Sequence, residues 1–192
     1  MRRLAIAAAL LALAACGGGP ETYEWVDWSD ADEKTAEGRA SGVRVAFLGD
    51  LNAATNTSGE GENFFAAVPE TFSHPDIGAG PPDAEILRMF GGNETGRQAL
   101  NFSRPVEAPV FAILSLGGDR TARIVFETEV ELLQTGPGYW GGSEGTLVLE
   151  DDNKTLVGDE GYGLVRVPGE HTEIGFATPN FESDYGFQLA IK

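Results

Sequence analysis

The sequence contains few of the residues on which metal centres and nucleic-acid interfaces depend. Its 192 residues include one cysteine, two histidines and 13 lysines or arginines, against 30 aspartates or glutamates. A single cysteine excludes an internal disulfide framework and any multi-cysteine zinc or iron–sulfur site. The formal net charge of −17 leaves no basic stripe to neutralise phosphates. We therefore expect no nucleic acid among the partners.

Long apolar runs are scarce as well. The longest, Leu4–Ala15, is shorter than the roughly 20 residues that a bilayer-spanning helix needs. Arg2 and Arg3 precede this run. A short basic segment followed by a short apolar segment and small residues is typical of a secretory signal peptide. We expect residues 1–15 to be such a peptide, removed from the mature protein.

The apolar run ends in Leu13-Ala14-Ala15-Cys16, which resembles the bacterial lipobox. The resemblance implies that Cys16, the only cysteine, receives a diacylglycerol after cleavage. An ordinary signal peptide with an incidental cysteine is the alternative. Acyl chains stabilise membrane attachment by about 0.8 kcal/mol per buried CH2, so several chains give a stable anchor. Residues 16–21 would then be a lipidated spacer and residues 22–192 one domain in water.

The residue after the cysteine bears on the destination of the lipoprotein. It is Gly17, and no aspartate is there to resemble an inner-membrane retention signal. We therefore expect a lipid-anchored protein of the bacterial outer membrane, on its periplasmic or cell-surface face.

Turn-forming residues recur through the rest of the chain about every 8–12 residues, which is typical of a β-sandwich or barrel. No sustained helical period follows the signal peptide. We expect an all-β fold, an antiparallel and jelly-roll-like β-sandwich of about ten strands, with residues 29–37 in a loop or a short helical turn. The expected strands are 22–28, 42–48, 84–90, 97–102, 109–116, 122–133, 145–149, 155–157, 163–167, 172–177 and 186–191.

Two of these segments predict how their strands are buried. Residues 122–133 alternate, with Glu127, Glu129 and Glu131 on one face, and such a row is typical of a solvated face rather than a metal site. Residues 109–116 are nearly all apolar. We expect them to form a central strand that is buried on both faces.

A glycine-rich segment with two aromatic residues, Thr135–Gly142, carries a family resemblance. Together with residues 26–29, 40–43, 155–163, 174–181 and 186–187, it resembles a group of secreted bacterial proteins often found with PEP-CTERM sorting tails. The resemblance covers residues 22–192, and its motifs are turn and core residues. It implies an extracytoplasmic all-β domain at the envelope or in the matrix, and no catalytic residues. The chain differs from the group at Tyr162, where a histidine is expected, and in ending at Lys192 without a sorting tail.

Few residues are candidates for catalysis. Gly141–Gly145 matches the G-x-S-x-G pattern with Ser143 as the nucleophile, but a strand is expected where that pattern requires a helix. His74 and His171 are each expected in loops. Among 30 carboxylates a pair for glycoside hydrolysis can always be drawn, so their presence decides nothing. A secreted hydrolase using Ser143 or a carboxylate pair is the alternative function.

No cofactor is expected, with a structural calcium ion left open. Asp151, Asp152 and Asp159 offer loop oxygens of the kind that Ca²⁺ prefers, although their spacing is not that of an EF-hand.

The main candidates for ligand binding are Tyr139 and Trp140, which lie between glycines. Partly exposed aromatic rings offer flat apolar faces on which sugar rings can stack. The alternative is that Trp140 folds back over the edge of the sandwich, with the glycines allowing tight turns. We expect a non-catalytic envelope lipoprotein that binds glycan, or another envelope or matrix component, through its loop ends. A purely structural role is a further alternative.

Overall fold

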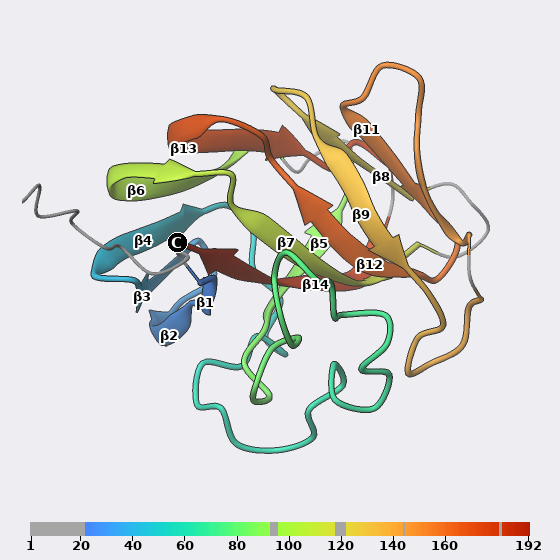
Figure 1. Cartoon of the computed structure of the whole chain (residues 1–192), viewed down its shortest axis with the longest axis horizontal. Coiled ribbons are helices and arrows are strands. Elements are labelled where there is room, and N and C mark those ends of the chain that lie inside the picture. Colours follow the sequence, from blue (N-terminus) through green and yellow to red (C-terminus); the bar gives the residue numbers. More distant parts are fainter. Residues whose placement is uncertain (1–21, 93–95, 118–121, 144, 181) are drawn as a thin grey trace, which may run out of the picture.

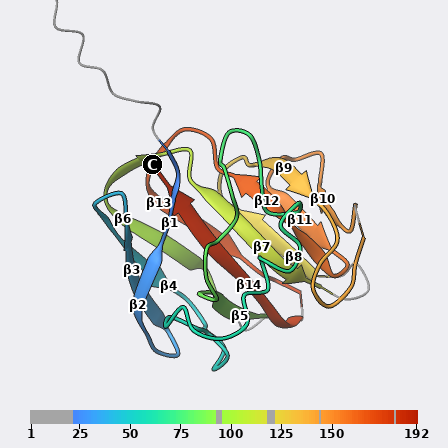
Figure 2. The same cartoon turned by 60° about the horizontal axis from the view of Figure 1, so that its bottom comes forward.

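The computed structural model describes residues 22–92, 96–117, 122–143, 145–180 and 182–192, and within these ranges it contains strands and no helix. Fourteen strands form two antiparallel sheets that pack on each other (Figure 1, Figure 2). The prediction of an all-β, antiparallel sandwich is confirmed. The expected signal peptide and Cys16 lie outside the described residues. Among the described residues, no helix is long and apolar enough to cross a membrane.

The two sheets are called sheet A and sheet B here. Sheet A has six strands, in the order β1 (Glu24–Trp25), β14 (Glu182–Ile191), β7 (Val110–Leu116), β12 (Gly161–Arg166) and β9 (Glu131–Thr135), with β5 (Leu87–Gly91) also paired to β14. Sheet B has eight, in the order β10 (Leu147–Leu149), β11 (Thr155–Gly158), β8 (Ala122–Phe126), β13 (Glu170–Ala177), β6 (Gln98–Glu107), β4 (Val43–Leu48), β3 (Thr35–Ala40) and β2 (Asp27–Ala31).

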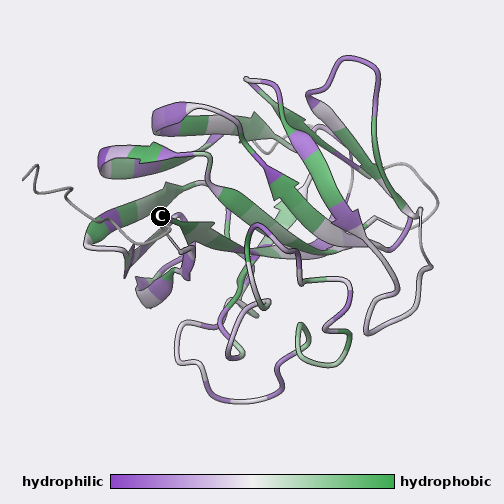
Figure 3. Cartoon of the chain, in the orientation of Figure 1, coloured by the Kyte–Doolittle hydropathy of each residue, from purple (hydrophilic) through white to green (hydrophobic). Residues whose placement is uncertain are grey.

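The inner faces of the two sheets share one apolar core, because alternate side chains of each strand point to the same face. Phe111 of sheet A lies edge-on to Phe126 of sheet B, with ring centroids 5.4 Å apart. Trp28 is fully buried and donates its indole N–H to Gln188 Oε1 at 2.7 Å. The core thus joins the second strand to the last, and the strands that enclose it are coloured mainly as hydrophobic in Figure 3.

The structure has 14 strands against eleven expected segments, and two of the three additional strands arise because an expected segment crosses from one sheet to the other. Residues 122–133 divide into β8, in sheet B, and β9, in sheet A. Between them Val130 is buried and donates its N–H to Asn153 O at 2.7 Å. Residues 22–28 divide in the same way at Val26, whose N–H bonds Leu189 O at 2.8 Å. Alternation continues through each crossing, so the sequence pattern alone does not reveal it.

The predicted loop at residues 29–37 is the other difference. It holds the end of β2 and the start of β3, which form a hairpin. Asp32 closes this hairpin because its carboxylate accepts the backbone N–H groups of Lys34 and Thr35, each at 2.7 Å. The polar residues that indicated a loop therefore lie on an exposed edge strand and its turn.

The long loop at residues 49–86 lies beside the outer face of sheet A, where Figure 1 shows it below β14, β7 and β12. Phe65 and Phe72 of this loop are buried, with ring centroids 5.0 Å apart. They belong to a second apolar cluster that includes Leu114 and Tyr162 from the outer face of the sheet. Strand β7 is accordingly buried on both faces, as its apolar sequence predicts.

Candidate functional site

The loop after β9 presents the two predicted aromatic residues at the tip of a tight turn. Gly138 and Gly141 hydrogen-bond to each other through their backbones, with N···O distances of 3.0 and 3.4 Å. Tyr139 and Trp140 are the two residues between them. The turn therefore projects both rings from a backbone that is closed at its base.

Buried groups beneath the turn fix its position. Gly138 packs so closely on Tyr162 that a Cβ atom at this glycine would lie 1.8 Å from the ring. The hydroxyl of Tyr162 accepts the backbone N–H of Trp140 at 3.3 Å. The loop at residues 49–86 contributes Thr71, which donates its hydroxyl to Pro137 O at 2.8 Å. The presentation of Trp140 thus depends on both sheet A and the loop that covers it.

The backbone beside Tyr162 adopts an uncommon conformation. Ser115, at the end of β7, and Glu160, before β12, have φ angles of 58° and 52°, in the left-handed region that costs energy for residues other than glycine. The hydroxyl of Ser115 donates to Glu160 Oε2 at 2.7 Å. Burial raises the pKa of Tyr162, so its hydroxyl stays protonated at neutral pH. These three residues form the rigid surface on which the aromatic turn packs.

Three partly exposed rings, from Phe64, Tyr139 and Trp140, form what we call the aromatic platform. Phe64 lies in the loop at residues 49–86, with its ring centroid 4.5 Å from that of Trp140 and 4.9 Å from that of Tyr139. The centroids of Tyr139 and Trp140 are 5.1 Å apart. Trp140 keeps 45% of its surface exposed and Tyr139 keeps 39%. Trp140 thus packs against a neighbouring loop and still presents a large apolar surface to water.

Polar groups border the platform on two sides. The hydroxyl of Tyr139 donates to Glu62 Oε1 at 2.6 Å, and this hydrogen bond raises the pKa of the tyrosine. On the other side, the guanidinium carbon of Arg88 lies 5.4 Å from the centroid of the Trp140 ring, within the range of a cation–π contact. Arg88 Nε also donates to Asp184 Oδ1 at 2.8 Å. Flat rings and hydrogen-bonding groups therefore occur together on one surface.

The candidate catalytic residues each have a hydrogen-bond partner within a few residues in the chain. Ser143 is exposed in the turn after Trp140, and its carbonyl accepts the N–H of Thr146 at 3.2 Å. His74 accepts the N–H of Asp76 within its own turn at 3.2 Å. His171 lies in β13 rather than in the predicted loop, and its ring is 2.8 Å from Pro168 O. Each histidine is hydrogen-bonded within its own segment, and among the described residues neither forms a hydrogen bond with Ser143.

The candidate calcium ligands lie at the two ends of β11. Asp151 and Asp152 are in the turn before this strand, and Asp159 follows it. The carboxylate of Asp152 accepts hydrogen bonds from Lys154 N at 2.8 Å and from Thr155 N at 2.9 Å, and these bonds lower its pKa. Among the described residues, no group of three or more potential ligands is placed to hold a metal ion.

Phe64, Glu62, Arg88 and Asp184 are parts of the surface that the sequence analysis did not identify. They lie on the loop at residues 49–86, on β5 and on β14, far in sequence from the aromatic turn. The Phe64–Phe65 pair within a polar loop is the one local signal of this packing. Comparison of the chain with protein-family models, with curated proteins and with solved structures gave no match.

Proposed function

We propose that this protein is a non-catalytic, lipid-anchored protein of the bacterial envelope that binds a glycan on its aromatic platform. The observation that carries the proposal is the preorganised exposure of Trp140 and Tyr139 above the buried ring of Tyr162. Exposure of the apolar indole ring to water is unfavourable. A turn that holds the ring outward therefore indicates that the ring contacts another molecule.

The chemistry of the platform fits a sugar. The C–H faces of a pyranose ring pack on flat aromatic rings, while its hydroxyls need hydrogen-bond donors and acceptors at the rim. The carboxylates of Glu62 and Asp184 and the guanidinium of Arg88 supply such groups beside the rings. Because these groups are already held in place by one another, little conformational entropy is lost on binding.

The negative charge of the protein indicates whether the glycan is charged or neutral. The chain carries a formal net charge of −17, and Glu62 is an exposed carboxylate at the platform. Arg88, which lies beside the ring of Trp140, is paired with Asp184. Negative charge around the site repels uronate, sulfate and phosphate groups. We therefore propose a neutral glycan as the ligand.

A glycan array tests the binding proposal. The full chain, purified in detergent, is applied to an array of neutral and anionic glycans beside the Trp140→Ala variant and a Leu48→Ala control. Leu48 is 49% exposed on sheet B, so its loss removes a similarly exposed apolar side chain away from the platform. We expect saturable binding to neutral glycans that Trp140→Ala abolishes and Leu48→Ala retains. Equal binding by the three proteins, or none, would refute the proposal.

The lipid anchor is tested separately with Cys16→Ser in the native host. We expect the wild-type protein to incorporate an alkyne-labelled fatty acid and to sediment with outer membranes, and the variant to do neither. An unlabelled wild-type protein in the soluble fraction would show that Cys16 is incidental.

A further inference from the structure

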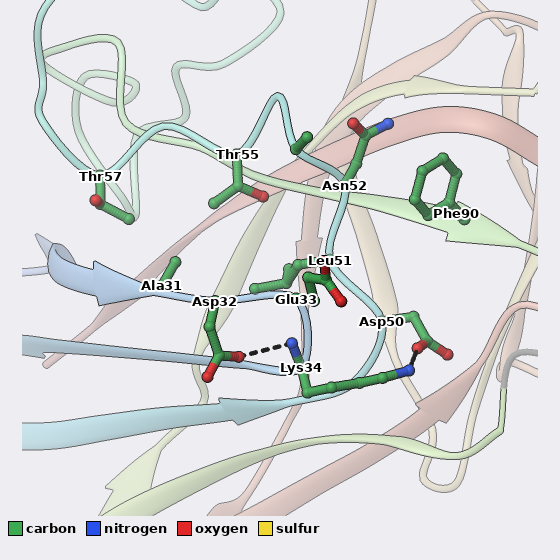
Figure 4. Close-up of a pocket in the computed structure, with 11 residues that line it drawn as sticks. Ala31, Asp32, Glu33, Lys34, Asp50, Leu51, Asn52, Thr55, Thr57 and Phe90 are labelled. Atoms are coloured by element: carbon green, nitrogen blue, oxygen red, sulfur yellow. Dashed lines mark hydrogen bonds and ion pairs between the residues drawn. The ribbon is translucent and has the colours of Figure 1, made fainter.

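A groove of about 770 Å³ opens on the side of the sandwich, next to the edge strand β5 (Figure 4). Its walls are the β2–β3 turn, including Lys34, and the segment from Asp50 to Thr57. Phe90, at the end of β5, contributes an aromatic side chain that is 43% exposed. The groove therefore has the same combination of an open ring and polar groups as the aromatic platform.

The groove and the platform are joined by a chain of contacts. Asn52 lines the groove, and its side-chain amide donates to Asp184 Oδ1 at 3.4 Å. Asp184 is bonded to Arg88, whose guanidinium lies 5.4 Å from the centroid of Trp140. Three adjoining polar side chains thus connect one aromatic surface to the other.

The register of β5 places Phe90 beside this connection. Arg88 and Phe90 alternate with the buried residues Leu87 and Met89, so both side chains point to the outer face of the strand. Residues two apart on a strand are separated by about 6.6–6.8 Å. Phe90 therefore lies next to Arg88 along the same face of β5, and Arg88 in turn contacts the ring of Trp140.

The wall of the groove is held in place by backbone hydrogen bonds. Leu51 donates its N–H to Glu33 O at 2.9 Å, which fastens the segment to the β2–β3 turn. Asn52 donates its N–H to Arg88 O at 2.7 Å, and Asn56 exchanges N–H···O bonds with Ile86 at 2.9 Å. The segment thus follows β5 like a further strand, so the groove exists before any ligand arrives.

We infer that the groove is a second subsite of the glycan site and that the ligand is a chain of several neutral sugars. The chain would stack one sugar on Trp140, cross the Arg88–Asp184 pair and place a later sugar against Phe90. This inference rests on the proposed function, because it takes the aromatic platform to be a sugar-binding site and adds how many sugars the ligand contains. It predicts that a single sugar or a disaccharide occupies only the platform.

A chain-length series tests the inference. The full chain in detergent is titrated by calorimetry with gluco-oligosaccharides and N-acetylglucosamine oligosaccharides of two to six sugars. In the series that binds, we expect affinity to rise at least tenfold from the disaccharide to the hexasaccharide. Phe90→Ala should remove this rise and leave the disaccharide affinity unchanged, whereas Trp140→Ala should abolish binding at every length. Leu48→Ala, on sheet B, should match the wild type throughout.

The outcomes separate the two claims. If the disaccharide binds as tightly as the hexasaccharide, or if Phe90→Ala leaves the hexasaccharide affinity unchanged, the groove is no subsite although the platform binds sugar. If neither series binds the wild type, the proposed function and the inference fail together. Circular dichroism of Phe90→Ala checks the fold, which we expect to be intact because the side chain is exposed.

Discussion

The two sheets share one core but differ on their outer faces. The outer face of sheet A is apolar, as at Leu114, and the loop at residues 49–86 packs on it. The outer face of sheet B carries ion pairs, in which Arg97 binds both Glu127 and Glu173. Gly175 of sheet B leaves space for these groups, since a Cβ there would lie 2.2 Å from the Glu127 carboxylate.

This difference decides where a binding surface can form. Side chains on the face of sheet B interact with one another in water, and each exposed ion pair contributes little to stability. On sheet A the apolar residues of the outer face are buried by the loop at residues 49–86. This loop brings Phe64 beside the turn that follows β9. The loop at residues 49–86 thus forms a third layer outside sheet A, and the aromatic platform depends on it. Substitutions should therefore affect the outer faces of the two sheets unequally.

The largest effect is expected at the centre of the third layer. Phe72 is fully buried, and its replacement by alanine should cost about 3–5 kcal/mol because it leaves a cavity. Phe90→Ala removes an equal volume from an exposed position and should cost far less. Urea unfolding monitored by tryptophan fluorescence measures both. Equal losses would mean that the loop at residues 49–86 is not a true layer of the fold.

A smaller effect, dependent on pH, is expected at Glu85, which ties this loop to sheet B. Its Oε2 accepts the backbone N–H of Trp28 at 2.9 Å, and burial raises the pKa of its carboxyl from 4.5 to about 7. Between these values the folded protein binds a proton that the unfolded chain releases, so stability falls as pH rises from 4.5 to 7. The loss of stability is smaller than the roughly 3 kcal/mol that the full shift would give, because water partly screens the carboxyl.

The Glu85→Gln variant isolates this contribution from the general effect of the acidic surface. It keeps an oxygen for the Trp28 N–H and removes the titration. We expect the wild type to lose more stability than the variant between pH 5 and pH 8, as measured by urea unfolding. Parallel losses in the two proteins would show that Glu85 does not titrate in this range.

The aromatic turn should respond to a single methyl group. Gly138→Ala places a Cβ against the ring of Tyr162, and overpacking of this kind costs about 1–3 kcal/mol. The turn must move, so we also expect glycan affinity to be lost. Gly96→Ala is the matched control, because a Cβ there meets nothing within 4 Å. Unchanged affinity in Gly138→Ala would indicate that the position of the turn is not important for binding.

The smallest effect is expected on sheet B. Arg97 pairs with Glu127 and Glu173 in a network whose three side chains are each about half exposed, at 47%, 53% and 46%. Arg97→Gln should leave the melting temperature unchanged within error, because water and salt screen such pairs. A clear loss of stability would mean that the outer face of sheet B also forms a cooperative layer.

The sequence predicted the class of fold and the identity of the aromatic turn, because both depend on local patterns. Alternation identifies strands such as β7, and glycines around Tyr139 and Trp140 identify a turn. Neither pattern records where a strand changes sheet, as at Val130. The residues that contact Trp140 could not be predicted from the sequence either, because Phe64 and Arg88 approach it only in the folded structure.

The tryptophans allow the most direct test of the aromatic platform. The indole N–H of Trp25 bonds Ala79 O at 3.1 Å and that of Trp28 bonds Gln188 Oε1 at 2.7 Å, whereas Trp140 is partly exposed on the platform. In ¹⁵N-labelled protein, each indole gives its own NMR signal during titration with a neutral oligosaccharide. We predict that the Trp140 signal shifts saturably while the signals of Trp25 and Trp28 stay in place. A ligand that binds without moving the Trp140 signal, or three stationary signals with every neutral glycan, would contradict the account.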